Sequence, residues 1–166
     1  VGNIGNPILL EKNITNKTLF VIEASSYQLE YSKLFKSNIA LILNISPDHL
    51  DRHKTINKYV NAKFKLIKNQ SVKDLAILNV NNFYIKHQLK IKNFSSRVIK
   101  INKKTNIYHV RKIKNKYFAT DGNKKNLQFV FAVTNILKLK KKLLFRTLEK
   151  FKGLRYRQEI IYNSKK

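Results

Sequence analysis

The sequence predicts an α/β protein built on a doubly wound, mostly parallel sheet. Short apolar runs rich in β-branched residues alternate with amphipathic stretches of helical period over residues 1–80. That order is typical of a parallel sheet with helices on its faces. Hydrophobic residues make up 43% of the 166 residues, which argues against disorder, and the length fits one domain of ordinary size.

Apolar runs bounded by polar or turn-forming residues predict the strands of this sheet. Two buried strands are predicted at residues 19–24 and 39–45, a third and a fourth strand at 75–80 and 97–101, and a last strand at 158–162. Two further runs flank a short polar turn and predict a small β-hairpin extension, at residues 107–111 and 116–119.

Capping residues and apolar periodicity predict the helices. Ser25 followed by Gln28 forms a capping box, which starts a helix that should run to about residue 36. Ser46 and Pro47 fit an N-cap and a first helical position. Apolar side chains at 56, 59, 60, 64 and 67 share one helical face, and closing helices are expected at 127–138 and 143–151.

The charge is high and uneven. Residues 1–51 carry a net charge of −1 and residues 52–166 a net charge of +27, which gives +26 overall. Such a surface could bind nucleic acid, yet the lysines are scattered over every predicted element, and we find no RNA-binding aromatic motif, zinc finger or clear helix-turn-helix. A solvated basic surface, which also suits phosphate-bearing small substrates, is the preferred interpretation, and a nucleic-acid-binding fragment is the alternative.

Several function classes are excluded by what the sequence lacks. It has no Cys, so disulfides and thiolate metal sites are ruled out. No apolar run approaches the roughly 20 residues that span a membrane, and no basic leader precedes an apolar stretch, so a cytoplasmic location is expected. The chain contains no Met and begins at Val1, and we therefore expect it to be a piece of a longer protein.

Polar residues gather where the predicted strands end. Glu23 closes the first strand, Asp48 and His49 follow the second, and Asn3 sits in a glycine-flanked turn. Ligands of open α/β sheets bind beyond the carboxyl ends of the strands, and a carboxylate with an imidazole can share a divalent cation or its waters. Taken singly, each of these residues could equally be a turn, cap or solvent-facing residue.

Lys63 fills a gap in the apolar face of the helix predicted from residue 56. A lysine there either extends its ammonium outward to solvent or has a specific role. In a chain so rich in lysine, the pattern alone favours the outward-reaching side chain.

Three stretches resemble the central domain of the Mur ligases. They are residues 23–30 (E-A-S-S-Y-Q-L-E), residues 43–53 (L-N-I-S-P-D-H-L-D-R-H) and residues 62–64 (A-K-F). The first stretch is most similar to the members that add D-glutamate. The turn at residues 2–5 and the G-L-R-Y-R-Q-E segment at 153–159 also resemble family motifs.

The resemblance implies an ADP-forming acid–amino-acid ligase of peptidoglycan synthesis, the process that supports cell shape and division. ATP phosphorylates the carboxylate of UDP-N-acetylmuramoyl-L-alanine, and the amine of D-glutamate then displaces phosphate, with Mg²⁺ as cofactor. No membrane and no specific nucleic acid are expected as partners. The implied catalytic and metal residues are Glu23, His49 and Lys63, the last as a carbamate. The implied substrate-binding residues are Asn3, Ser25 and Gln28, and the implied nucleotide-binding residues are Arg157 and Asn135.

The sequence departs from the family pattern in ways that affect these expectations. The first strand and the glycine-rich phosphate loop of the family would lie before Gly2, and the usual H-N-x-x-N segment is F-A-V-T-N at 131–135. We therefore expect residues 1–162 to be a partial central ATP-binding domain and 163–166 the start of a linker, with no ligase activity in the chain alone. Another Mur-type or folylpolyglutamate-type ligase stays open as an alternative.

Overall fold

The computed structural model describes residues 1–3 and 5–154, and a parallel sheet lies at its centre. Among these residues the sheet has three strands in the order β1-β2-β3: β1 (Ile39–Ile42), β2 (Leu75–Asn79) and β3 (Arg97–Ile101). Both neighbouring pairs are parallel, with Ala40 opposite Ala76 and Ala76 opposite Val98. The predicted α/β class with a parallel sheet is confirmed.

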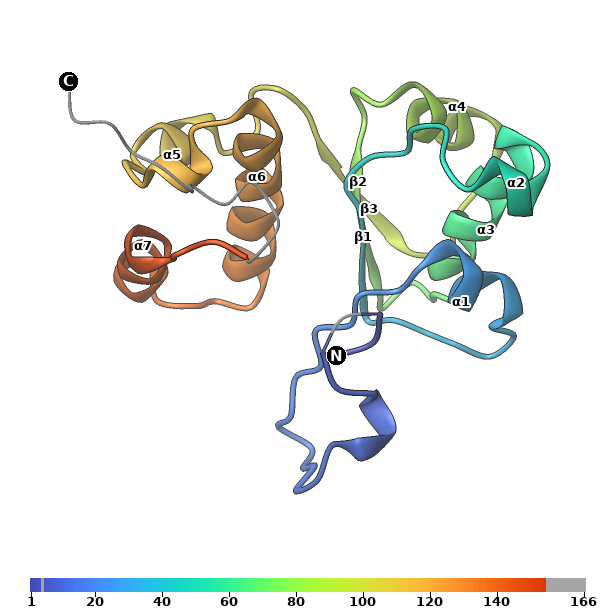
Figure 1. The fold of residues 1–166 in the computed structure, drawn as a ribbon, viewed down its shortest axis with the longest axis horizontal. Helices are drawn as coiled ribbons and strands as arrows, with labels where there is room; N and C mark the ends of the chain where they lie inside the picture. The colour runs from blue at the N-terminus through green and yellow to red at the C-terminus, as the bar shows by residue number, and fades with distance from the viewer. Residues whose placement is uncertain (4, 155–166) are drawn as a thin grey trace.

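Helices cover both faces of the sheet, as Figure 1 shows. On one side lie α1 (Ser26–Tyr31), α2 (Leu50–His53), α3 (Ile56–Lys68) and α4 (Phe83–Ile91). On the other side lie α5 (Ile107–Arg111), α6 (Asp121–Ile136) and α7 (Lys141–Lys150). Two short 3₁₀ turns, η1 (Ile8–Leu10) and η2 (Lys116–Phe118), complete the described elements.

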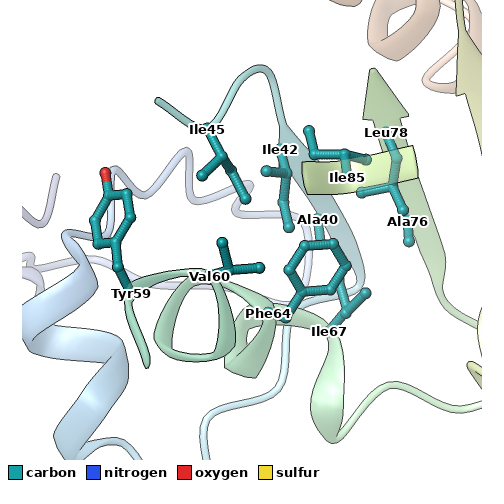
Figure 2. Close-up of a cluster of buried hydrophobic side chains, with 10 residues drawn as sticks. All are labelled: Ala40, Ile42, Ile45, Tyr59, Val60, Phe64, Ile67, Ala76, Leu78 and Ile85. Carbon is teal, nitrogen blue, oxygen red and sulfur yellow. The ribbon is translucent and has the colours of Figure 1, made fainter. Parts of the chain in front are cut away.

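The larger core lies between the sheet and α3, and Figure 2 shows its side chains. Val60, Phe64 and Ile67 of α3 are 2%, 4% and 2% exposed and pack on β1, β2 and α4. These are the positions at which the sequence places its helical apolar stripe, so the predicted helix from Ile56 is confirmed. Thr55 caps it, since its side chain accepts a hydrogen bond from the Lys58 amide.

The opposite face of the sheet packs on α6. Phe129, Ala132, Val133 and Ile136 contact the side chains of β1, β2 and β3 that point away from α3, among them Ile77 and Ile101. A third apolar cluster lies on the far side of α6, where its Leu127 and Phe131 meet α5 and α7.

The prediction of a buried strand at residues 19–24 is wrong. This segment runs beside the start of the chain through one parallel bridge, Gly2–Glu23, and its Leu19 and Val21 are 63% and 78% exposed. Within the described residues its pairing partner is limited to residues 1–3, which is too short for a ladder, and no helix covers its apolar side chains.

The predicted β-hairpin extension is also wrong. Residues 107–111 form α5 and residues 116–118 form η2. Ile107 and Val110 stand three residues apart, a spacing that serves a helical face as well as a strand, and Val110 is 4% exposed against Leu127 and Phe131. The burial of Val110 against α6 therefore favours the helix over the strand.

Several helix boundaries in the structure also differ from the predicted ones. No helix starts at Ser46 and Pro47; α2 begins after His49, whose φ of 52° interrupts the helical backbone. α1 ends at Tyr31, before the predicted residue 36, because Ser32 is extended. α6 begins at Asp121, earlier than the predicted 127, and α4 falls where no element was predicted.

Some predictions lie outside the described residues. They are the strand at 158–162, the nucleotide contact of Arg157, most of the 153–159 motif and the domain boundary at 162.

Candidate functional site

Glu23 is held beside the start of the chain. The Asn3 amide nitrogen donates to the Glu23 carbonyl at 2.8 Å, and the Asn3 side chain donates to the Glu23 Oε1 at 3.4 Å. Gly2 makes this approach possible: its φ is +104°, and a Cβ there would collide with the Glu23 carbonyl oxygen. The Glu23 carboxylate is thus exposed and oriented by Asn3.

Ser25 and Gln28 form the predicted capping box at the start of α1. The Gln28 amide donates to the Ser25 Oγ at 3.2 Å, and the Ser25 amide donates to the Gln28 Oε1 at 2.9 Å. Both side chains therefore serve the helix terminus, and Gln28 as a whole is exposed. Their substrate-binding role stays a prediction.

His49 lies in a ring of aromatic side chains from three helices. Its imidazole is 5.0 Å from the Tyr27 ring and 6.3 Å from the Tyr59 ring, measured between centroids. The Asp48 carboxylate lies 3.4 Å from its Nε2. Burial and the nearby Asp51 and Asp48 carboxylates raise the pKa of Tyr27 above its usual value, so the phenol stays neutral beside His49.

His53 is the centre of this group, and the sequence analysis missed it. The residue is 3% exposed, its Nε2 lies 3.0 Å from the Ser26 Oγ and its Nδ1 lies 3.9 Å from the Glu30 carboxylate. Its ring stacks on Tyr27 at 5.5 Å and contacts Tyr59 at 5.3 Å. We call Tyr27, His49, His53 and Tyr59 the aromatic–histidine cluster. The helical spacing of His49 and His53 was the one signal for it.

Lys63 joins this cluster through Tyr59. Its half-buried side chain places Nζ 5.0 Å from the centre of the Tyr59 ring, one helical turn earlier on α3. Tyr59 is 4% exposed, and its ring contacts both Lys63 and the two histidines. The structure thus brings Lys63 and His49 to the same side of the sheet.

The predicted metal residues fall into two groups in the described part of the chain. Asn3 contacts Glu23, and His49 shares Tyr59 with Lys63, while among the described residues no hydrogen bond, ion pair or ring contact joins the first pair to the second. Within residues 1–3 and 5–154 no three His, Cys, Asp or Glu side chains gather closely enough to hold an ion by themselves.

Asn135 lies far along α6, on the opposite side of the sheet from Lys63. Figure 1 shows α6 starting near the carboxyl ends of the strands and running toward their other ends. The Asn-x-x-Asn spacing that the family motif requires occurs at Asn123 and Asn126, in the first turns of α6. The sequence analysis overlooked this pair, which is an alternative to Asn135 for the predicted nucleotide contact.

The fold is thus a parallel sheet between helical layers, with an imidazole and a lysine on one side of it and the Glu23 carboxylate held separately by Asn3. The chain matches the Mur ligase middle domain over residues 2–145, and it belongs to the Mur ligase family. It is 33% identical to the UDP-N-acetylmuramoylalanine–D-glutamate ligase of Rickettsia bellii, over 98% of this chain and 40% of that relative. It is 32% identical to the enzyme of the same name from Clostridioides difficile, again over 98% of this chain and 40% of the relative.

A shorter and stronger match lies within this span. Over 49% of the chain, the identity to the ligase of the same name from Koribacter versatilis reaches 50%. The chain spans about 40% of the length of the curated relatives that it matches along its whole length. In the part of the chain that the structure describes, no helix is both long and apolar enough to cross a membrane.

Proposed function

We propose that this chain is the middle domain of an ADP-forming ligase that joins D-glutamate to UDP-N-acetylmuramoyl-L-alanine, in the cytoplasm where ATP is available. The observation that carries the proposal is the shared position of His49 and Lys63 against Tyr59, in a chain whose relatives at 32–33% identity bear that ligase name. The reaction has two steps. ATP transfers its γ-phosphoryl group to the substrate carboxylate, and the D-glutamate amine then attacks the acyl phosphate, so that phosphate leaves.

A Mg²⁺ ion that also binds substrate phosphates would be held by the exposed Glu23 carboxylate, because Asp48 and His49 belong to the other group of site residues. Mg²⁺ prefers oxygen ligands and usually takes one or two protein carboxylates, with water and phosphate filling its other positions. The Glu23 and Asp48 carboxylates are both exposed, and Asn3 orients the first. When bound, the ion would neutralise the charge of the transferring phosphoryl group.

Lys63 is proposed to act as a carbamate, formed when its neutral amine adds to CO₂ and releases a proton. The Lys63 Nζ lies 5.0 Å from the centre of the Tyr59 ring, whose face attracts a cation. The carbamate form is favoured when positive charge lies close by, because the modified side chain is then an anion on a long arm.

The remaining site residues are proposed contacts of the substrates. Gln28 and Ser25 present the start of α1, and Asn3 the adjoining turn, toward the UDP-linked substrate. For the nucleotide we propose Arg157 together with an asparagine of α6. Asn126 lies at the end of α6 nearer the carboxyl ends of the strands, where open α/β sheets bind ligands, and Asn135 at the other end.

A hybrid enzyme tests the proposal. The chain would replace the matching segment of the Rickettsia bellii ligase, and formation of the UDP-linked product would be followed with ATP and D-glutamate. We expect product only when both are present. In the hybrid, Glu23→Ala should abolish turnover, because it removes a carboxylate from the phosphoryl-transfer site. A folded hybrid without product, or a Glu23→Ala variant with unchanged turnover, would contradict the proposal.

Lys63→Ala in the same hybrid separates the carbamate from a lysine that merely covers apolar surface. We expect near-complete loss of turnover and partial recovery on adding short-chain carboxylic acids, which supply the missing anion. Lys58→Ala, on an exposed position of the same helix, is the matched control and should keep full turnover. Wild-type turnover of Lys63→Ala would show that the lysine has no catalytic role.

The isolated chain is expected to form no product, since it matches only about 40% of its relatives. Product formed by the purified chain from ATP, D-glutamate and the UDP-linked substrate would contradict this expectation.

A further inference from the structure

A cavity of about 400 Å³ lies between α5, α6 and α7. Its volume is within the roughly 300–1,000 Å³ of small-molecule sites. Three rings form one wall: His109 is 5.4 Å from Phe131, and Phe131 is 5.6 Å from Phe145. Aromatic walls of this kind stack against the flat faces of planar ligands.

The cavity is separate from the proposed ligase site. Its wall includes Phe131 and Asn135, on the side of α6 that faces α5 and α7. The other side of α6 packs on the sheet through Phe129 and Val133, and Lys63 lies beyond the sheet on α3. A small ligand in this cavity therefore cannot touch Lys63 or the aromatic–histidine cluster.

Four of the polar side chains around the cavity make no polar contact within the described part of the chain. Among the described residues, the side chains of His109, Asn135, Lys138 and Lys141 make no hydrogen bond and no ion pair. By contrast, Asn106 and Thr134, which also line it, donate to backbone carbonyls at 2.9 and 2.8 Å. The cavity thus offers two cations, an amide and an imidazole with free bonding capacity.

The charge around the cavity has one sign. No carboxylate lines it, and residues 102–152 carry 15 basic and 2 acidic side chains. Two lysines held at one rim without a counter-charge repel each other, and an anion placed between them relieves this repulsion. The ligand class that suits both the aromatic wall and the cationic rim is a planar ring that carries a phosphate or carboxylate.

We propose that this cavity binds a planar aromatic anion of about the size of a mononucleotide, with its ring against Phe131 and Phe145 and its anionic group between Lys138 and Lys141. Asn135 and His109 supply the hydrogen bonds to the ring edge. Asn135 then belongs to this second site, and the nucleotide of the ligase reaction is left to Asn126. The inference does not depend on the proposed ligase activity.

Nuclear magnetic resonance titrations of the 166-residue chain test the proposal with three probes. Adenosine 5′-monophosphate has a ring and a phosphate, adenosine has the ring alone and inorganic phosphate the anion alone. We expect the monophosphate to bind at least tenfold more tightly than either half. It should shift the ring signals of His109, Phe131 and Phe145 and leave those of Tyr27 and Tyr59 unchanged.

Substitutions at the rim locate the binding. Lys141→Gln should weaken binding of the monophosphate about twofold to fivefold, the range for one partly exposed charge contact. Asn135→Ala should weaken it without changing phosphate binding. Lys142→Gln is the matched control, because the neighbouring lysine does not line the cavity. All three side chains lie at or near the surface, so the variants are expected to fold. A well-dispersed spectrum of each variant verifies this.

Three results would overturn the proposal. The first is equal affinity for the monophosphate and phosphate, which would show that charge alone attracts the ligand. The second is an equal loss of affinity in Lys141→Gln and Lys142→Gln. The third is a monophosphate that shifts the aromatic–histidine cluster and leaves the cavity rings unmoved, which would place it at the ligase site. None of these results bears on turnover of the hybrid enzyme.

Discussion

On one face of the sheet α3 inserts Val60, Phe64 and Ile67 into a closely filled core, whereas beyond the other face α5, α6 and α7 meet around a cavity of about 400 Å³. The polar side chains of the two regions differ in burial and in the bonds that their donor groups make. Beside α3, Gln70 is 4% exposed and donates to the Ser37 and Leu75 carbonyls at 3.0 and 2.9 Å. Around the cavity, Asn135 and Lys141 have no such partner among the described residues.

The two regions differ in whether their polar side chains are already ordered before a ligand binds. On the α3 side His49 and Lys63 are oriented by Tyr27 and Tyr59, so little ordering remains for a substrate to induce. On the α6 side the unpaired groups must be ordered by the ligand itself, which lowers affinity. A reacting site is expected on the first side and a weaker binding site on the second.

The largest expected effect comes from emptying the α3 core. Phe64→Ala should lower the free energy of unfolding by about 3–5 kcal/mol, since it removes a buried ring and leaves a cavity. Phe64 is 4% exposed and Phe83 is 74% exposed, so Phe83→Ala is the matched control and should change little. Chemical denaturation measures both. Equal losses would mean that the α3 side is no better packed than the surface.

A smaller loss of stability is expected from a substitution at Gly153, which lies close to Tyr117 of η2. Its φ is +90°, and a Cβ there would lie 2.7 Å from the Tyr117 ring. Gly153→Ala should cost about 1–2 kcal/mol from the left-handed backbone alone, and more from the clash. Gly122→Ala is the control, because nothing lies within 4 Å of its Cβ position. If both variants unfold at the same denaturant concentration, the close approach to Tyr117 is not tight in solution.

Breaking the capping box should cost less and act locally. Ser25→Ala removes the acceptor for the Gln28 amide and should destabilise by about 1 kcal/mol. Hydrogen exchange should quicken in α1 while the amides of α6 keep their protection. Ser95→Ala, at an exposed serine, serves as the control. Unchanged exchange in α1 would contradict a capping role for Ser25.

The last prediction concerns the acid range. The Ser71 amide and hydroxyl, at 2.7 and 2.8 Å, together with Lys36 lower the pKa of Asp74 from 3.8 to about 2. A carboxyl whose pKa is lowered by folding adds stability above its unfolded pKa and loses it as pH falls through the folded value. The wild-type chain should therefore lose stability between about pH 4 and pH 2.

Asp74→Asn tests this assignment through the pH profile of unfolding. The variant should have a lower free energy of unfolding than the wild type at neutral pH. This difference between the two proteins should shrink as pH falls from about 4 to about 2. A gap that stays constant over this range would show that Asp74 does not titrate as described.

The sequence predicted α3 and β3 far better than α5, for a physical reason. α3 carries a stripe of five apolar positions that fits only a helix, and β3 is an apolar run whose bounds were predicted as observed. Residues 107–111 allow both periods, and burial of Val110 against Leu127 decides between them. That contact joins residues far apart in the chain, which local patterns cannot contain.

The candidate site shows the same limit. Ser25 and Gln28 were found because a capping box is a local pattern, and the structure contains it. The part played by His53 depends on Ser26, Tyr27 and Tyr59 meeting in space, so spacing alone did not reveal it. Residues 19–24 were misjudged because an apolar run predicts burial only when some other element covers it.

His53 also determines how the α1–α3 side opens. α1 has 6 residues and α2 has 4, and helices this short do not persist by themselves. One buried imidazole contacts Ser26 and Tyr27 at the start of α1 and Tyr59 on α3, and it belongs to α2 itself. We therefore expect the three helices to open as one cooperative unit, so that the amides of α1 and α2 exchange no faster than this unit opens. A ligand that binds Gln28 or His49 should then also suppress local unfolding around Lys63, without contacting Lys63 itself.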